Sequence, residues 1–279
     1  MNDVFPSLTI VIPHFNHGHL IAQQLDAILA QSVQPTKIII IDDASTDDSV
    51  AVIKKQIFGH SNIELLCNKV NSGVVAVTNQ GLYLADTEFI TFPAADDILM
   101  PGFIEKSLNL LCRYPEAALC STITLIQYGA KEWYIPNWRS LPCATPEFLS
   151  PQKVSRLLMQ VEGWIMSNTV ILRREPLIEL GGQFSELLSS ADEFTYRVLA
   201  LRHGACFVPE PLAINCQSST SYSAVLNKND AIREKVLINL NALMRNKFPD
   251  LFPAKLVARS NARSLFRILC GKLDIFEQQ

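Results

Sequence analysis

The chain lacks the sequence signals that mark several protein classes. No G-x-G-x-x-G follows the first apolar segment and no G-x-x-x-x-G-K-S/T occurs anywhere, so neither a dinucleotide site nor a P-loop is indicated. The seven cysteines show no C-x-x-C spacing, which favours reduced thiols in a cytosolic protein. No apolar run approaches the roughly 20 residues that span a bilayer. The N-terminal residues lack a basic region followed by an apolar stretch, so we expect no signal peptide and a cytoplasmic location.

The composition is that of a globular protein without a nucleic-acid partner. The formal net charge is −3, so no global basic field points to nucleic acid. With 48% hydrophobic and 18% charged residues, the chain has ample material for a buried core. Its 279 residues suffice for one large α/β domain or for a domain with an appendage.

Strand-like and helix-like segments alternate regularly over the first 125 residues. We expect strands at residues 8–13, 38–41, 63–67, 88–92 and 117–121, with helices between them. Asn16 and Thr46 are expected to cap the first two helices. The alternation predicts a Rossmann-like α/β fold with a mostly parallel central sheet and helices on both faces. The pattern loosens over residues 126–150 and resumes with a strand at 169–172, a helix at 192–203 and a strand at 205–208.

Two acidic clusters follow expected buried strands. The first closes a run of four isoleucines and contains Asp43, and the second contains Asp96 and Asp97. Open α/β folds bind ligands at the carboxyl ends of their strands, so the two clusters could share one crevice. Carboxylates gathered there repel each other unless a cation or a hydrogen-bonding ligand joins them. The pattern predicts a site for a phosphate-bearing ligand with Mg²⁺ or Mn²⁺, which are hard cations that prefer oxygen ligands.

Five segments carry a resemblance to a known family. They are Leu8–Asn16 (LTIVIPHFN), Ile41–Asp47 (IDDASTD), Asn71–Gly81 (NSGVVAVTNQG), Phe92–Asp97 (FPAADD) and Gly181–Phe184 (GGQF) followed by Ala191-Asp192. The middle segments are similar to V-D-D-G-S-T-D, N-x-G-x-x-x-A-R-N-x-G and F-L-D-x-D-D, and the last to a G-G-F and E-D pair. In this order, over residues 8 to about 210, they resemble the family 2 glycosyltransferases, which have the GT-A fold.

The resemblance implies an inverting, hexosyltransferase-type enzyme. Such an enzyme moves a sugar from a nucleotide-diphosphate sugar, with UDP as the expected nucleotide, to the hydroxyl of a saccharide or lipid-linked acceptor. The biological setting that it implies is the synthesis of surface polysaccharide or glycolipid. Over residues 126–165, where acceptor specificity is expected to lie, the sequence offers no readable code, and it leaves the oligomeric state open.

The resemblance also assigns roles to individual residues. The nucleotide-binding residues that it implies are Pro13, Phe15, Asn16, Asp43, Asn71, Gly73 and Asp96. Among them, Asp43 is expected to accept a hydrogen bond from the base, typically uracil N3–H, because an ionised carboxylate only accepts. Asp97 and Asp96 are expected to hold the Mn²⁺ or Mg²⁺ that bridges the diphosphate. Asp192 is expected to be the general base that deprotonates the acceptor hydroxyl.

Four positions depart from the family's motifs and keep other readings open. Ala94 replaces the first acid of D-x-D, Thr78 the frequent arginine, and Ala191 the glutamate before Asp192, while Gln217 falls roughly where many members have R-x-H. The core acids remain, which favours an active enzyme. The alternatives are a non-catalytic member that binds nucleotide-sugar or scaffolds a partner and, less favoured, a sugar-phosphate nucleotidylyltransferase. The latter needs a glycine-rich loop with a basic residue after its first strand, and residues 14–18 supply neither.

The expected domain division places the catalytic domain at residues 1–215 and a helical extension at 216–279. Within the catalytic domain, residues 1–125 are expected to bind the nucleotide-sugar and residues 126–215 the acceptor. An amphipathic basic helix is expected over residues 255–273. Its arginines recur every four residues, at Arg259, Arg263 and Arg267, and its opposite face carries Ala258, Ala262, Leu265 and Leu269. This helix could lie on anionic lipid at the inner face of a membrane. Alternatively, it could pack on the catalytic domain or on the preceding helix, at Ile232, Val236, Leu240 and Leu243.

Overall fold

A computed structural model describes residues 5–128, 132–134, 141–160, 163–217 and 221–262. Its centre is a ten-stranded sheet in the order β3-β2-β1-β4-β9-β6-β10-β5, with β7 paired to β6 and β8 to β10. The strands are β1 (Leu8–His14), β2 (Lys37–Asp42), β3 (Ile63–Cys67), β4 (Phe89–Thr91), β5 (Ile98–Leu99), β6 (Leu119–Tyr128), β7 (Glu132–Tyr134), β8 (Glu147–Leu149), β9 (Ile171–Arg173) and β10 (Ala205–Gln217).

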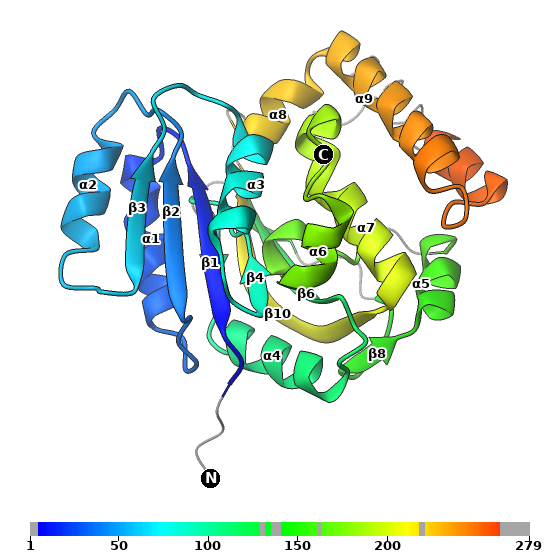
Figure 1. Ribbon diagram of the computed structural model, residues 1–279, viewed down its shortest axis with the longest axis horizontal. Coiled ribbons are helices and arrows are strands. Elements are labelled where there is room, and N and C mark those ends of the chain that lie inside the picture. Colours follow the sequence, from blue (N-terminus) through cyan, green and yellow to red (C-terminus); the bar gives the residue numbers. More distant parts are fainter. Residues whose placement is uncertain (1–4, 129–131, 135–140, 161–162, 218–220, 263–279) are drawn as a thin grey trace.

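Helices cover both faces of this sheet (Figure 1). They are α1 (Gly18–Leu29), α2 (Ser49–Gln56), α3 (Val74–Leu84), α4 (Phe103–Arg113), α5 (Pro151–Leu158), α6 (Arg174–Leu180), α7 (Ala191–His203), α8 (Tyr222–Asn227) and α9 (Asp230–Ala242). Two short 3₁₀ turns, η2 (Ser167–Thr169) and η3 (Ser185–Ser190), precede β9 and α7. The expected α/β fold class is therefore confirmed.

The two halves of the sheet differ in strand direction. Strands β3, β2, β1 and β4 are parallel to one another, as the regular alternation of strand and helix predicts. Beyond them β9 is antiparallel to both β4 and β6, while β6 and β10 run parallel over ten paired positions. The parallel half brings the carboxyl ends of β1, β2 and β4 to one edge of the sheet, away from the N-terminus in Figure 1.

The run of four isoleucines in β2 shows how the sheet is buried. Ile38 and Ile40 face a core cluster that includes residues of α1 and α4. Ile39 and Ile41 face the opposite cluster, to which α3, α6 and α7 contribute. All four side chains are fully buried, which explains why consecutive positions are apolar rather than alternating. Each such burial contributes about 1.5–3 kcal/mol to stability before the entropy of ordering is counted.

The first two helices do not begin as the sequence predicts. Asn16 has a positive φ of 54°, and its side-chain oxygen accepts from the backbone N–H of Thr46 at 2.8 Å rather than capping α1. The N-cap of α1 is His17, which makes no side-chain capping bond. Helix α2 begins only at Ser49, whose N–H donates to Asp47 at 3.0 Å. Both predicted caps were wrong because a contact between two loops competes with the local capping bonds.

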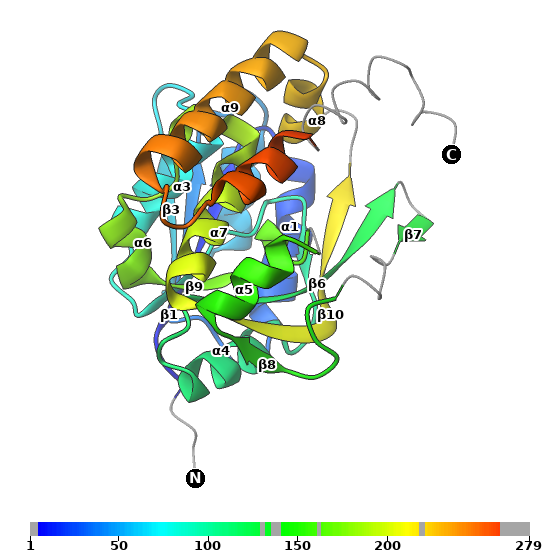
Figure 2. The same ribbon diagram turned by 90° about the vertical axis from the view of Figure 1, so that its right-hand side faces the viewer.

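The C-terminal helices pack as an outer layer against α7 (Figure 2). Six apolar side chains of this segment join the same core cluster as Phe184 and Phe194; they are Leu243, Met244, Phe248, Phe252, Leu256 and Val257. These residues therefore share one hydrophobic core with α6 and α7. No helix among the described residues is both long and apolar enough to cross a membrane.

The expected basic helix is described only over residues 254–262. Leu256 and Val257 are buried, and the Arg259 guanidinium donates to the Gln160 carbonyl at 3.5 Å. Ala258 and Ala262 are exposed, so the inward side of this part differs from the alanine face that the sequence predicts. This part therefore packs on the rest of the protein, and its Asn261 amide donates to Asn241 of α9 at 2.7 Å. Positions 263–273 lie outside the described residues.

Candidate active site

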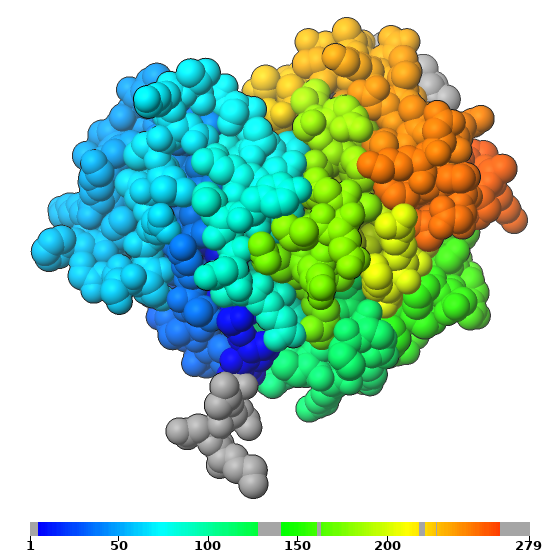
Figure 3. Space-filling view, viewed as in Figure 1, coloured from blue at the N-terminus to red at the C-terminus, as the bar shows by residue number. Residues whose placement is uncertain are grey.

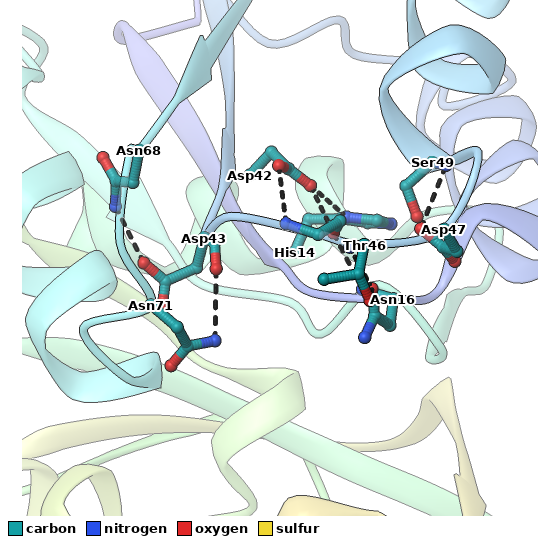
Figure 4. Close-up of polar contacts among 10 residues, drawn as sticks. His14, Asn16, Asp42, Asp43, Thr46, Asp47, Ser49, Asn68 and Asn71 are labelled. Carbon is teal, nitrogen blue, oxygen red and sulfur yellow. Dashed lines mark hydrogen bonds and ion pairs between the residues drawn. The ribbon is translucent and has the colours of Figure 1, made fainter.

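Asp43 follows β2 and is held by the loop after β3. Its side chain is 3% exposed and accepts from the Asn68 amide at 2.9 Å, the Ser72 hydroxyl and N–H both at 2.9 Å, and the Gly73 N–H at 2.8 Å. Burial alone would raise the pKa of Asp43, but these hydrogen bonds outweigh it and hold the pKa below its ordinary value. Asp43 is therefore an ionised acceptor, lying between Asn68 and Asn71 in Figure 4.

The loop that wraps Asp43 stays open on its outer side. The Asn71 amide donates to the Asp43 backbone carbonyl at 3.1 Å, and Gly73 has a φ of 87°, which side-chain-bearing residues rarely adopt. A Cβ added at Gly73 would meet nothing within 4 Å, so space is free beside the loop. Four donors already fill about as many lone-pair positions as a carboxylate has. A base N3–H that binds Asp43 must therefore displace one of them.

Asp42 locks the neighbouring turn, a role that the sequence reasoning missed. It is 1% exposed and accepts from the Ser45 hydroxyl at 2.5 Å and from its N–H at 3.1 Å. The His14 ring nitrogen Nδ1 lies 3.1 Å from Asp42, at the end of the adjacent strand β1 (Figure 4). The signal available in the sequence was the position of Asp42, which is the last residue of a buried strand and directly precedes Asp43.

The residues at the end of β1 and in the loop that follows lie beside this turn. The Asn16 N–H donates to the Ser45 hydroxyl at 2.9 Å, and its side chain reaches Thr46, so Asn16 ties the two loops together. Pro13 is half-buried, and Phe15 is 42% exposed. The hydrogen-bonded turn thus presents an open aromatic ring, whose face is suited to stacking on a flat heterocycle.

Asp97 is the most perturbed carboxyl of the second acidic cluster. It is 3% exposed, accepts from the Asn215 amide at 3.0 Å, and is also contacted by the Cys216 N–H and the Asn168 side chain. Burial, together with the negative charge of Asp96, raises the pKa of Asp97 to about 8, although the three donors act in the opposite direction. An isolated buried carboxylate is costly, so a cation beside it would favour the ionised form.

The second acidic cluster fits a metal ion that a diphosphate helps to hold. Asp96 is half-buried beside Asp97, and Ala94 contributes no acid. Among the described residues no group of three His, Cys, Asp or Glu side chains could hold a metal on its own. Mg²⁺ is commonly bound by one or two carboxylates together with substrate phosphates, so the pair suffices for that mode. Asp97 and Asp96 are the residues that would hold it.

Asp192 lies in the first turn of α7, as the sequence predicts. It is half-buried, and burial raises the pKa of its carboxyl, aided by the negative charge of Glu193. The Ser167 hydroxyl and the Glu193 N–H, which donates at 2.7 Å, act against that rise. Glu193 instead pairs with Arg197 one turn along the helix. The two adjacent acids are thus in different surroundings.

Thr78 and Gln183 join the two halves of the protein through neutral contacts. The Thr78 hydroxyl lies 3.4 Å from the Gln183 side-chain oxygen, and the Gln183 amide lies 3.4 Å from the buried Tyr196 hydroxyl. Asn79 exchanges two hydrogen bonds with the Gln183 backbone, at 2.8 and 2.9 Å. A Cβ at Gly182 would come within 2.5 Å of the Asn79 oxygen, so this close approach requires glycine. In Figure 3 the surfaces of the cyan α3 region and the yellow-green α6 region abut.

Sequence reasoning missed the amide and hydroxyl partners of the acids. Asn68, Asn168 and Asn215 each donate to a predicted site carboxylate, and Ser167 donates to Asp192. Asn68 carried a signal because it directly follows a strand expected in the parallel part of the sheet. Asn215 lies two positions before Gln217, which is exposed at the end of β10. The other partners carried no readable signal.

Residues 9–181 match the family model described as Glycosyl transferase family 2. This match covers more than half of the chain, and the chain belongs to this family.

Curated relatives carry glycosyltransferase names. A Haemophilus influenzae protein named uncharacterized glycosyltransferase is 34% identical over 106 residues, which are 38% of this chain and 42% of that protein. The chain thus matches less than half of that relative's length. The Erwinia amylovora protein named amylovoran biosynthesis glycosyltransferase AmsB is 25% identical over 222 residues, covering 76% of this chain and 70% of that protein.

Solved structures share the fold at low sequence identity. Staphylococcus aureus TarS in complex with UDP-GlcNAc aligns with a TM-score of 0.72 and 16% identity, covering 93% of this chain and 72% of that one. The mannosyltransferase PcManGT from Pyrobaculum calidifontis, in complex with GDP-Man and Mn²⁺, aligns with a TM-score of 0.65 and 19% identity, covering 99% of this chain and 77% of that one. The chain therefore has the GT-A fold of these glycosyltransferases.

Proposed function

We propose that the protein is an inverting glycosyltransferase that moves a sugar from a nucleotide-diphosphate sugar to a hydroxyl acceptor. One observation carries the proposal: Asp97 and Asp192, both with raised pKa values, are contacted by consecutive residues of the same turn, Asn168 and Ser167. These adjacent contacts support the proposal that the two carboxyl groups belong to one site. One of them suits a metal-bound diphosphate, and the other suits proton abstraction from an acceptor.

The donor is proposed to be a nucleotide sugar, with UDP as the first candidate. The solved relatives hold UDP-GlcNAc in one case and GDP-Man with Mn²⁺ in the other. Asp43, an ionised acceptor, suits the N3–H of uracil, and the exposed ring of Phe15 suits stacking on the base. Pro13 and Asn16 shape the rim beside it, and the free space at Gly73 gives the nucleotide room to approach.

The reaction is proposed to be a single displacement. Asp192 takes the proton from the acceptor hydroxyl while its oxygen attacks the anomeric carbon, and the bond from that carbon to the diphosphate oxygen breaks. Attack from the face opposite the leaving group inverts the anomeric configuration. A divalent ion held by Asp97 and Asp96 would supply positive charge to the departing diphosphate. The amide of Asn215 orients the carboxylate of Asp97 whether or not an ion is bound.

The setting and the domain roles are also proposals. Residues 1–125 are proposed to bind the nucleotide-sugar and residues 126–215 the acceptor, with the segment from 216 as the extension. A hexose is the proposed transferred group, and a saccharide or lipid-linked hydroxyl is the proposed acceptor. The curated name of AmsB, which refers to amylovoran biosynthesis, supports a role in making surface polysaccharide or glycolipid.

A non-catalytic, nucleotide-sugar-binding role is the second candidate. It is favoured by Ala94, which leaves two acids where the family has three, and by the neutral contact of Thr78 with Gln183 in place of an arginine. Transfer or donor hydrolysis above background that is lost in Asp192→Asn would exclude this candidate. Nucleotide-sugar binding without turnover would favour it.

A thermal-shift panel tests the proposed donor class. The purified protein is heated with UDP-, GDP-, dTDP- and CDP-sugars, each with Mn²⁺ and with EDTA. A ligand at a hundred times its dissociation constant adds about 2.7 kcal/mol to the free energy of unfolding, which is enough to detect. We expect stabilisation by UDP-sugars with Mn²⁺. No shift with any nucleotide sugar in either condition would contradict the proposed function.

A further inference from the structure

The η2 turn, Ser167–Thr169, lies between the two proposed catalytic carboxyl groups. It precedes β9 and packs against β6, β10 and α7. Its three residues contact different partners. Ser167 contacts Asp192 on α7, Asn168 contacts Asp97, and Thr169 contacts the backbone of β6. One short turn therefore connects the helix that carries the proposed base with the loop that carries the proposed metal ligand.

Ser167 is placed to orient Asp192. Its hydroxyl donates to the Asp192 carboxylate, and the other donors to that group among the described contacts are the backbone N–H groups of Asp192 and Glu193, in the first turn of its own helix. Glu193 adds a negative charge and Tyr196 a buried phenol beside Asp192. A donor that comes from outside α7 therefore fixes the direction in which this carboxylate points and favours its ionised form.

Asn168 is placed to orient Asp97. Its side chain is 8% exposed and donates to the Thr124 hydroxyl on β6 at 3.1 Å. The amide has two N–H groups, so it donates to Thr124 and to Asp97 at once. Asn215 supplies a second side-chain donor to Asp97 from β10. Asp97 thus accepts from two side-chain amides, that of Asn168 in the η2 turn and that of Asn215 on β10.

Thr169 anchors the turn without touching either carboxyl group. It is fully buried, and its hydroxyl donates to the Thr122 carbonyl at 3.0 Å or to the Met166 carbonyl at 2.8 Å. Its hydroxyl also lies 3.2 Å from that of Ser121. These contacts fix the turn to β6, an interior strand of the sheet. The turn is therefore a rigid support whose two other side chains reach outward to the site.

We propose that Ser167 and Asn168 are positioning residues that set the geometry of Asp192 and Asp97 relative to each other through one turn anchored on β6. The proposal rests on the proposed function, because the two carboxyl groups are the proposed base and metal ligand. Productive displacement requires the acceptor oxygen and the departing diphosphate to be held in line, so a shared support for both groups limits their relative motion.

Ser167→Ala tests the contact to Asp192. The variant removes one donor to the ionised carboxylate, so the acid limb of kcat/KM for the UDP-sugar reaction should move to higher pH by roughly one to two units. The dependence on Mn²⁺ concentration, measured on the plateau of the pH profile, should stay within twofold. Ser167→Thr keeps the hydroxyl and should restore the wild-type limb. A limb that does not move in Ser167→Ala would overturn the role of Ser167.

Asn168→Leu tests the contact to Asp97 at a fixed pH. Leucine has the same branching and the same number of side-chain non-hydrogen atoms but donates no hydrogen bond, so the Mn²⁺ concentration for half-maximal UDP binding should rise by roughly 10–100-fold, as for other groups that support a metal ligand. With Mn²⁺ kept saturating at every pH, the acid limb of kcat/KM should not move. An unchanged Mn²⁺ requirement would overturn the role of Asn168.

Thr169→Val is the matched control for general damage to the turn. It removes the anchoring hydroxyl with little change in shape and should lower the melting temperature. The backbone bond from the Thr169 N–H to the Met166 carbonyl at 2.8 Å and the burial of the side chain remain, so the turn should keep its place. The acid limb and the Mn²⁺ requirement should then both stay within twofold of wild type. If Thr169→Val reproduces both shifts, they reflect loosening of the turn and the proposal of separate positioning roles is overturned.

Failure of the proposed function can be distinguished from failure of the proposed positioning roles. Wild-type protein that turns over no nucleotide sugar contradicts the proposed function, and Mn²⁺-dependent UDP binding would then still test Asn168 by calorimetry. For Ser167, the ¹³C chemical shift of the Asp192 carboxyl, followed against pH by NMR in Ser167→Ala and wild type, replaces the kinetic limb. Equal titration of Asp192 in both proteins would overturn its positioning role.

Discussion

Asp43 and Asp97 are both buried carboxyl groups near strand ends, but their surroundings differ. Asp43 accepts hydrogen bonds from Asn68, Ser72 and Gly73, and its pKa is lowered. Asp97 has amide donors too, yet burial and the charge of Asp96 raise its pKa to about 8. The difference lies in how well each negative charge is compensated within the protein.

This contrast assigns different tasks to the two ends of the site. A carboxylate that the protein already stabilises is ionised without a cation, so it can accept from a base N3–H that displaces one of its present donors. A carboxyl group that the protein leaves under-compensated gains most from a positive ion. The negative charge of Asp192 is also under-compensated, since burial raises the pKa of this carboxyl group as well. A raised pKa suits a group that must take up a proton.

Loss of the proposed base should have the largest effect. Asp192→Asn keeps the size of the side chain but removes its basicity, so turnover of the UDP-sugar should fall by roughly 10²–10⁴-fold. UDP affinity should stay nearly unchanged, because the nucleotide contacts lie elsewhere. Glu193→Gln is the matched control and should do much less, since Glu193 pairs with Arg197. Steady-state kinetics and calorimetry of both variants give the answer. An active Asp192→Asn beside an inactive Glu193→Gln would reverse the assignment.

Removal of Asp43 should weaken nucleotide binding in a base-dependent way. Asp43→Ala should reduce the binding free energy of uridine nucleotides by about 1.5–3 kcal/mol, the range for hydrogen bonds to charged groups. Cytidine nucleotides should lose less, because cytosine has no N3–H to donate. Ser72→Ala removes one of the donors that an N3–H would have to displace, so it should not weaken uridine binding. Titration calorimetry measures all three proteins. An equal loss for both bases in Asp43→Ala would make Asp43 a support of the loop.

The pH dependence of the reaction should reflect the raised pKa of Asp192. A general base works only when it is ionised, so kcat/KM should fall as pH drops through the pKa of Asp192 in the folded protein. Because burial raises that pKa above its ordinary value of 3.8, the acid limb should lie above pH 3.8. Rates across a pH series, with stability checked at each point, measure the limb. A rate that stays level down to pH 3.8 would contradict the role of Asp192 as the base.

Relief of backbone strain beside Asp43 should have the smallest effect. Ala44 has a φ of 63°, where an L-residue costs roughly 1–2 kcal/mol. Glycine removes that strain but gains freedom in the unfolded chain, so Ala44→Gly should stabilise the protein by about 0.5–1 kcal/mol. Ala76→Gly, at an exposed position inside α3, should instead lose about 1 kcal/mol. Chemical denaturation compares the two, and equal destabilisation would show that Ala44 is unstrained.

The parts that were predictable from sequence are those set by local pattern. Apolar runs predicted β1 to β4, and the acids that follow them placed Asp43 and Asp97 at strand ends. Asp192 was placed in the first turn of α7 by its helical surroundings. Whether Asp43, Asp97 and Asp192 act in nucleotide binding, metal binding and proton transfer stays a prediction.

The remaining contacts depend on residues that are distant in sequence. Asn215 lies 118 positions from Asp97, and Asn16 lies 30 positions from Thr46. A single sequence gives no signal for such pairs, which form only when the sheet brings β10 beside β5 and the loop after β1 beside that after β2. The same reason hid the η2 turn, whose partners lie on α7 and in the loop before β5.

The contrast between the two ends of the site is tested most directly by calorimetry of uridine and UDP binding to the wild-type protein, each with Mn²⁺ and with EDTA. Uridine contacts the Asp43 end alone, so its affinity should be the same in both conditions. UDP also reaches Asp97, so it should bind more tightly than uridine with Mn²⁺ and lose that advantage in EDTA or in Asp97→Asn. UDP affinity that is equal with Mn²⁺, with EDTA and in Asp97→Asn would contradict the metal-dependent role of Asp97.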